Sequence, residues 1–301
     1  MDAWRNRLVL VALLATAHAT ACTQPGEDGP GPRPDADGGL DDGRSDTGGD
    51  ADADGRGDGI PDWTTDEAEC VQDLDIVFVL DVSTSMTPVL SALRDGIADV
   101  WARAVEISPD PWFGLVVFVD DVRVTNEGRT YATMGTLQNE FEYWRGFCSS
   151  NGEPGGSSGF NDDCPENSLD ALWEAANRFP WRPDSLRMIV LATDDTFVER
   201  PQTLGSADIM VQRTYPEVLA AMREREIRVA AFAAHDSSNC GIPPRHDTEP
   251  GFFTPYGADP PLPEATGAPV FDIMDVMSGS VSMAAAIGDV ILDEYCTPYP
   301  I

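Results

Sequence analysis

The stretch LDIVFVLDVSTS, residues 74–85, decides the fold. Its first seven residues form an apolar run, interrupted only by Asp75, which predicts a buried strand of a parallel sheet over residues 74–80. Asp81, Ser83 and Ser85 follow directly on a short loop. Side chains just beyond the carboxyl end of such a strand face the crevice in which open α/β sheets bind ligands. The loop therefore offers one carboxylate and two hydroxyl oxygens at the expected ligand-binding edge.

Two later segments supply further oxygen atoms. Residues 186–193 form a second buried strand pattern that ends at Asp194, and PENSLDAL, residues 165–172, opens a helical pattern after a Gly/Ser-rich loop. The second segment carries Glu166 and Ser168. Carboxylate and hydroxyl oxygens are ligands that Mg²⁺ and Ca²⁺ prefer, so the three segments together indicate a site for a hard divalent cation.

These three pieces resemble the von Willebrand factor A (VWA) domain and its metal-ion-dependent adhesion site, over roughly residues 69–296. That family has the motif DxSxS after its first strand, a Thr on a middle loop and an Asp after its fourth strand. In this chain the matching positions are Asp81, Ser83, Ser85 and Asp194.

The middle position departs from the commonest family pattern. Counted back from Ala171 and Leu172, the Thr position is occupied by Glu166. This form resembles the integrin β-chain version, in which Glu is the ligand. Ser168 is the second choice for the ligand, or else it is the N-cap of the helix.

The resemblance implies one bound divalent ion, Mg²⁺ or Ca²⁺, and no catalytic residues. In the VWA family a carboxylate from a protein partner takes the last coordination position. The implied function is therefore metal-dependent protein binding or cell adhesion by a surface-anchored module, with an unknown protein ligand. The alternative is an accessory or structural envelope lipoprotein that scaffolds without metal. The expected metal ligands are Asp81, Ser83, Ser85, Glu166 and Asp194.

The order of the patterns predicts the fold class. Strand and helix patterns alternate after residue 70, which is typical of an α/β domain with helices on both faces of a mostly parallel, Rossmann-like sheet. Two long loops, 196–213 and 235–265, follow strand ends and should lie on the metal side. The expected strands are 74–80, 112–119, 122–126, 186–193, 228–234 and 269–273. The expected helices are 88–107, 134–146, 167–178, 215–225 and 280–294.

Composition excludes several functions. The 301 residues carry 52 acidic and 19 basic side chains, for a net charge of -33, and every basic residue is Arg. Without Lys there is no P-loop lysine and no Schiff-base lysine. Nucleic-acid binding needs clustered positive charge, so nucleic acid is not an expected partner. The one Gly-x-Ser-x-Gly match, residues 155–159, lies within a Gly/Ser-rich loop and not on a turn between a strand and a helix, so an α/β-hydrolase has no support.

The first 65 residues predict export and a tether. Residues 1–22 read as a lipoprotein signal peptide, with a basic start, an apolar run too short to span a bilayer, and small residues before Cys22. Lipidation of Cys22 would anchor the protein to a membrane. Residues 23–65 form a Gly-, Pro- and Asp-rich linker expected to be disordered, and residues 66–301 form the VWA domain. We expect an outer-membrane or cell-surface lipoprotein; ordinary cleavage, giving a secreted or periplasmic protein, is the alternative.

The remaining cysteines suggest disulfides, which exported proteins can form. Cys70 precedes the first strand and Cys296 ends the last helix, and domain termini often lie close together. A Cys70–Cys296 bridge is therefore expected. Cys148 and Cys164 bracket the Gly/Ser-rich loop and form a second candidate pair, which leaves Cys240 over.

Overall fold

A computed structural model describes Cys70, residues 72–235 and residues 247–300. The predicted signal peptide with Cys22, the predicted linker and Cys240 lie outside these described residues. The domain is built on a six-stranded sheet in the order β3-β2-β1-β4-β7-β8, in which only β3 runs antiparallel to its neighbour. The strands are β1 Asp73–Asp81, β2 Trp112–Phe118, β3 Val122–Val124, β4 Ser185–Thr193, β7 Ile227–Ala233 and β8 Val270–Asp272.

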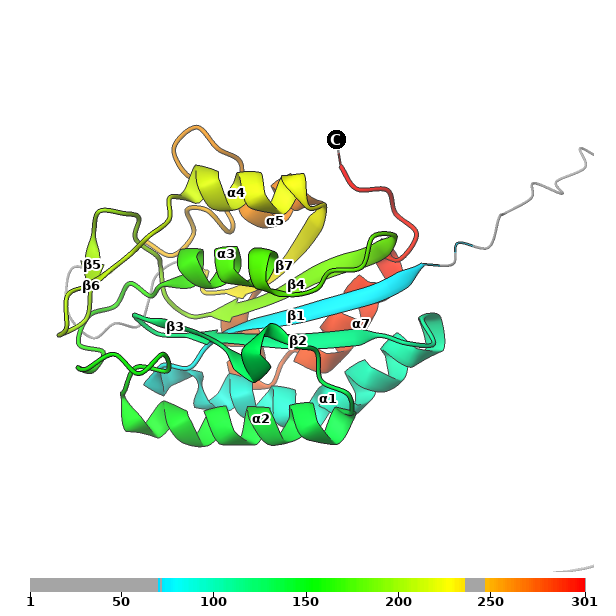
Figure 1. Ribbon diagram of the computed structural model, residues 1–301, viewed down its shortest axis with the longest axis horizontal. Coiled ribbons are helices and arrows are strands. Elements are labelled where there is room, and N and C mark those ends of the chain that lie inside the picture. Colours follow the sequence, from blue (N-terminus) through cyan, green and yellow to red (C-terminus); the bar gives the residue numbers. More distant parts are fainter. Residues whose placement is uncertain (1–69, 71, 236–246, 301) are drawn as a thin grey trace, which may run out of the picture. The chain divides into compact units, whose positions relative to one another are not determined.

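Helices cover both faces of the sheet (Figure 1). The first face is covered by α1, α2, α6 and α7, and the second by α3, α4 and α5. In the described part of the chain, no helix is long and apolar enough to cross a membrane. The helices are α1 Thr87–Ile107, α2 Met134–Phe147, α3 Ser168–Arg178, α4 Tyr215–Glu224, α5 Leu262–Thr266, α6 Ile273–Ser278 and α7 Met283–Glu294.

The central strand β1 shows why the sequence forms this sheet. Successive side chains of a strand point to opposite faces. Ile76 and Phe78 enter the core under α1, whereas Val77 and Val79 enter the core under α3 and α4. Both faces are covered, so the strand must be apolar throughout, as the sequence indicated. The predicted α/β class with a mostly parallel sheet is confirmed.

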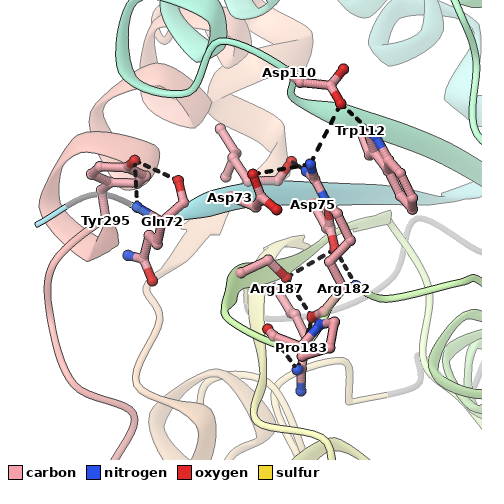
Figure 2. A network of polar contacts seen from close by, with 11 residues as sticks. Gln72, Asp73, Asp75, Asp110, Trp112, Arg182, Pro183, Arg187 and Tyr295 are labelled. Carbon is pink, nitrogen blue, oxygen red and sulfur yellow. Dashed lines mark hydrogen bonds and ion pairs between the residues drawn. The ribbon is translucent and has the colours of Figure 1, made fainter.

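Asp75, the one acid inside this apolar run, is neutralised at the amino end of the sheet (Figure 2). It is only 3% exposed. Its carboxylate accepts hydrogen bonds from Nε of Arg182 at 2.7 Å, from the Arg182 backbone N–H at 2.8 Å and from Oγ of Ser185 at 2.9 Å. The Arg182 guanidinium also lies 4.4 Å from the ring centroid of Trp112. A buried charge is tolerated here because it is paired and hydrogen-bonded.

Several short elements were not predicted. The expected loop 196–213 contains a two-stranded hairpin, β5 Thr203–Leu204 and β6 Ile209–Met210, which lies at the carboxyl edge of the sheet (left in Figure 1). The loop 235–265 contributes the short helix α5, and α6 directly follows β8. Two-residue strands and five-residue helices are too short for periodicity to reveal.

One predicted disulfide is confirmed and the other is wrong. Cys70 and Cys296 are bonded, with a Cα–Cα distance of 5.9 Å. Cys148 carries a free thiol, whereas Cys164 is disulfide-bonded, and its partner is not among the other described cysteines. Cys148 lies in the core at the end of α2, where its thiol donates to the carbonyl of Trp144 at 3.3 Å. Its side chain therefore packs into the core instead of bridging the loop to Cys164.

Candidate metal centre

The candidate site lies where the chain reverses its direction across the sheet. From β1 the chain passes through α1 to β2 on one side, and from β4 it passes through α4 to β7 on the other side. Because α1 and α4 cover opposite faces, the loops after β1 and β4 diverge. Such a switch point leaves a crevice at the carboxyl ends of the strands, where open α/β sheets bind ligands. Asp81 ends β1, and Asp194 follows β4.

The Asp81 carboxylate is fully buried, and both its oxygens are oriented by neighbours. Oδ1 accepts the backbone N–H of Ser83 at 2.7 Å. Oδ2 accepts the hydroxyl of Thr193, the last residue of β4, at 3.0 Å. Thr193 Oγ1 in turn accepts the backbone N–H of Asp195 at 3.2 Å. Adjacent strands therefore fix one carboxylate at the base of the crevice.

The two serines link Asp81's loop to the end of β4. Oγ of Ser83 and Oγ of Ser85 lie 3.1 Å apart. The Ser85 hydroxyl donates to Oδ1 of Asp194 at 2.9 Å. Hydrogen bonds therefore connect four of the five predicted ligands, which come from the ends of β1 and β4. These four are Asp81, Ser83, Ser85 and Asp194.

The fifth predicted ligand is held by the loop before α3. The Glu166 backbone N–H donates to the carbonyl of Thr196 at 2.8 Å, and the Asn167 N–H donates to the carbonyl of Val119 at 2.8 Å. This segment is therefore fastened between the chain that follows β2 and the chain that follows β4. These two backbone hydrogen bonds fix the position of Glu166 relative to the loop that carries Asp194.

The Glu166 side chain is 1% exposed and has one unsatisfied oxygen. Oε1 accepts from the amide of Asn161 at 2.8 Å, whereas Oε2 has no hydrogen-bond partner among the described residues. Glu166 lines a hollow of about 240 Å³ together with Ser83, Ser85 and Asp194. A buried carboxylate oxygen without a partner is costly, and a cation in the hollow would satisfy it.

Ser168, the second choice for the middle ligand, is differently placed. It is the first residue of α3, and it is not among the described residues that line the hollow. The N-cap of α3 is Asn167, whose side chain accepts the backbone N–H of Asp170 at 3.4 Å. The alternative prediction that Ser168 is the N-cap is therefore wrong, because the N-cap lies one residue earlier.

The electrostatics of the hollow favour a cation. Burial, followed by the charge of Asp194, raises the pKa of Asp81 to about 7. The hydrogen bonds from Ser83 and Thr193 lower this pKa, but by less. Burial, and next the charge of Asp81, raise the pKa of Glu166 well above its usual range. Burial also raises the pKa of Asp194. These carboxyl groups resist being ionised together, and a divalent cation between them would reverse the direction of all three shifts.

A second buried acidic pair, Asp120 and Glu153, lies near the site, where the charge of Asp120 helps to raise the pKa of Glu166. The Asp120 carboxylate is fully buried and makes no hydrogen bond in the described part of the chain. Oε2 of Glu153 accepts the backbone N–H groups of Asp120 and Asp121, each at 3.1 Å. Burial and the neighbouring Glu153 raise the pKa of Asp120 to about 9, so this group favours its neutral form at pH 7 unless a cation lies beside it.

The donor set fits a hard divalent cation with mixed ligands. Within the described residues, no three His, Cys, Asp or Glu side chains converge to hold a metal ion by themselves. The hollow instead combines the two serine hydroxyls with carboxylates, and Mg²⁺ commonly binds one or two carboxylates beside other oxygens and water. The unsatisfied Oε2 of Glu166 is the structural observation that most favours such an ion.

Two residues of the site escaped sequence analysis. Thr193 orients Asp81, and Asn161 orients Glu166. Thr193 immediately precedes Asp194 at a strand end, which is a usable signal for an accessory hydroxyl. Asn161 lies in an irregular loop five residues before Glu166, and no local pattern marks it.

Comparisons with known proteins add similarity of form only. No protein-family model and no curated protein matches the sequence. An aerotolerance-related membrane protein from Bacteroides fragilis aligns at 14% identity and a TM-score of 0.44, over 73% of this chain and 99% of its own. BatB from Bacteroides thetaiotaomicron aligns at 12% identity and a TM-score of 0.41, over 72% and 98%. Proximal thread matrix protein 1 from the mussel byssus aligns at 12% identity and a TM-score of 0.41, over 73% of this chain and 47% of its own. Similarities at this level say nothing about what the chain binds.

Proposed function

We propose that this domain is a VWA-type module that binds another protein through a divalent metal ion. The observation that carries the proposal is that four of the five predicted ligands line one hollow, while Oε2 of Glu166 is buried and unsatisfied. The fifth, Asp81, is hydrogen-bonded to the backbone N–H of Ser83. We propose binding as the role because the VWA family, which the motif resembles, uses such a site of oxygen ligands for Mg²⁺ or Ca²⁺ to hold a carboxylate of a protein partner.

Each ligand has a distinct part in holding the ion. The hydroxyls of Ser83 and Ser85 are uncharged donors on the loop after β1, and Ser85 is exposed enough to meet solvent. Glu166, on the loop before α3, would contribute its unsatisfied Oε2. Asp81 and Asp194 supply negative charge, Asp81 from the base of the crevice. When bound, the ion would act as a Lewis acid with a coordination position open to an anionic oxygen.

The resemblance to the VWA family supplies the class of partner. The position left open by the chain would be completed by a carboxylate of a protein ligand. The site would carry about three negative charges against the two positive charges of the ion, so the chain's own ligands leave it slightly anionic. This balance favours Ca²⁺, or a partner that compensates the charge.

A metal-free scaffolding role is the second candidate, and one observation favours it. The hydroxyls of Ser83 and Ser85 already satisfy each other and Asp194, and Asp81 has partners on both oxygens. Protonation of Asp81 and Glu166 could then neutralise the site without an ion. In that case the domain would be an accessory or structural part of a cell envelope.

The two candidates differ in their response to chelator. Pull-downs from envelope extracts with the full chain, in Mg²⁺, in Ca²⁺ and in chelator, should recover a partner only with a metal ion. The Asp81→Ala variant should recover none. Recovery of the same partner in chelator, or by Asp81→Ala, would favour the scaffolding role.

We also propose that the domain is displayed on a bacterial envelope through a lipid on Cys22. This proposal rests on the sequence of the first 65 residues, which lie outside the described part. Detergent partitioning of the wild type should place it in the detergent phase, and Cys22→Ser should move it to the aqueous phase. Equal solubility of the two forms would instead favour a secreted or periplasmic protein.

A further inference from the structure

The two carboxylate oxygens of Glu166 have different surroundings. Oε1 accepts a hydrogen bond from Nδ2 of Asn161 at 2.8 Å, whereas Oε2 has no partner in the described part of the chain. The Asn161 amide presents its NH2 group to an ionised Glu166, since its own oxygen would face a carboxylate oxygen there. Glu166 can therefore offer a cation one oxygen without losing this bond, but not both.

A second asparagine holds the backbone of Asn161 in place. Nδ2 of Asn151 donates to the Asn161 carbonyl at 2.7 Å, and the Asn161 N–H donates to the Asn151 carbonyl at 3.4 Å. Asn151 has a φ of 52°, in the left-handed region, which Asn adopts more readily than most residues. Both asparagines line the same hollow as Glu166. The amide that reaches Glu166 thus comes from a backbone that is itself hydrogen-bonded on both sides.

Glu166 is held at its own end of the contact as well. Its backbone N–H donates to the carbonyl of Thr196 at 2.8 Å. Because both residues are anchored, Glu166 could use its two oxygens on one ion only by giving up the bond from Asn161. A hydrogen bond to a charged group typically changes an equilibrium constant by about tenfold or more. The contact therefore disfavours coordination through both oxygens.

This restriction affects the two candidate ions differently. Ca²⁺ is the larger ion, takes more oxygen ligands and often binds a carboxylate through both oxygens. Mg²⁺ requires a nearly octahedral arrangement, which a carboxylate bound through both oxygens would distort. Restricting Glu166 to one oxygen therefore costs Ca²⁺ a ligand and costs Mg²⁺ nothing. The effect opposes the preference for Ca²⁺ that the excess negative charge gives the site.

We propose that Asn161 sets the metal selectivity of the site by restricting Glu166 to one oxygen, which disfavours Ca²⁺ relative to Mg²⁺. This inference rests on the proposed metal-dependent function and specifies how one residue tunes it. Asn161 is a positioning residue that acts through Glu166. Removing its amide should free Oε1 and allow Glu166 to bind Ca²⁺ through both oxygens.

Calorimetric titration of the full chain with each ion, for the wild type and for Asn161→Ala, tests the proposal. The Kd for Mg²⁺ should rise by up to about tenfold, because a ligand that loses its orienting partner binds more weakly. The Kd for Ca²⁺ should stay the same or fall. The ratio of the Ca²⁺ Kd to the Mg²⁺ Kd should therefore fall about tenfold.

Two further variants keep the test decisive. Asn161→Leu retains the size of the side chain without its donor, so it should change the ratio as Asn161→Ala does even if Ala loosens the loop. Gln138→Ala is the matched control, since it removes an amide on α2 that donates to the Arg94 carbonyl at 2.9 Å and does not line the hollow. It should leave both Kd values unchanged. Urea denaturation in chelator shows whether each variant is folded.

The outcomes separate this inference from the proposed function. If Asn161→Ala and Asn161→Leu raised both Kd values by the same factor, Asn161 would only support the loop, or its oxygen would bind either ion. The selectivity role would then be overturned, as it would by an unchanged ratio, and the metal site would stand. A wild type that bound neither ion would overturn the proposed function and this inference with it.

Discussion

Replacing Asp81 with Asn should stabilise the metal-free protein at pH 8. Asp81 is fully buried, and its pKa of about 7 in the folded chain compares with an ordinary value of 3.8. A shift of this size corresponds to about 4 kcal/mol of unfolding free energy, at about 1.4 kcal/mol for each unit. Asn keeps the acceptor oxygen and removes the charge, so the variant should be about 2–4 kcal/mol more stable in chelator.

The sign of the pH dependence follows from linkage. Because the folded pKa lies above the unfolded one, the folded state binds more protons between pH 3.8 and about 7. The stability of the wild type in chelator should therefore fall as pH rises through this window and level off above it. At pH 5 the advantage of Asp81→Asn should shrink to roughly half or less of its value at pH 8.

A divalent ion should stabilise the wild type more than it stabilises Asp81→Asn. At a concentration of about 100 times its Kd, a ligand that binds only the folded state adds about 2.7 kcal/mol. The wild type should gain this stability, and Asp81→Asn should gain little, so the gap between them narrows. Urea denaturation of both proteins at pH 5 and pH 8, with chelator and with Ca²⁺ or Mg²⁺, measures the free energy of unfolding under each condition.

Asp75→Asn is the matched control, since it removes the other buried acid of the same strand. Asp75 is paired with Arg182, so this variant should lose about 1–3 kcal/mol with or without metal. If Asp81→Asn were also less stable than the wild type in chelator at pH 8, the reasoning about an uncompensated carboxylate would be refuted.

Three further predictions concern single contacts. Glu166→Ala should abolish metal binding in calorimetry while Ser168→Ala preserves it, and the opposite result would mean that the middle ligand is misassigned. Replacing Cys70 and Cys296 with Ser should cost about 2–5 kcal/mol of unfolding free energy, since their bridge spans 226 residues; an unchanged urea midpoint would contradict this. Burial raises the pKa of Cys148 to about 12, so mass spectrometry should find it unalkylated at pH 8 until the protein unfolds, whereas rapid labelling of the native form would show that the thiol is accessible.

The parts of the fold that could be predicted are those governed by periodicity and burial. The run 74–80 had to be covered on both faces, and so it formed the centre of the sheet with Asp81 at its end. Because the carboxyl ends of parallel strands meet at one edge, Asp194 could be placed beside it from sequence alone.

The parts that could not be predicted depend on contacts distant in sequence. The pairing of Asp75 with Arg182 spans 107 residues, and only the oddity of an acid in an apolar strand hints at it. Cys148 was assigned to Cys164 from its place in the chain, but the direction of its side chain at the end of α2 decides the matter. Asn161 belongs to an irregular loop whose path is set by tertiary contacts.

Direct titration of the full chain with Mg²⁺ and with Ca²⁺ in a calorimeter tests the central claim most directly. The wild type should bind one divalent ion, and Asp81→Ala should lose most of that affinity. A wild type that binds neither ion, or an Asp81→Ala variant that binds as tightly as the wild type, would contradict the assignment of this site.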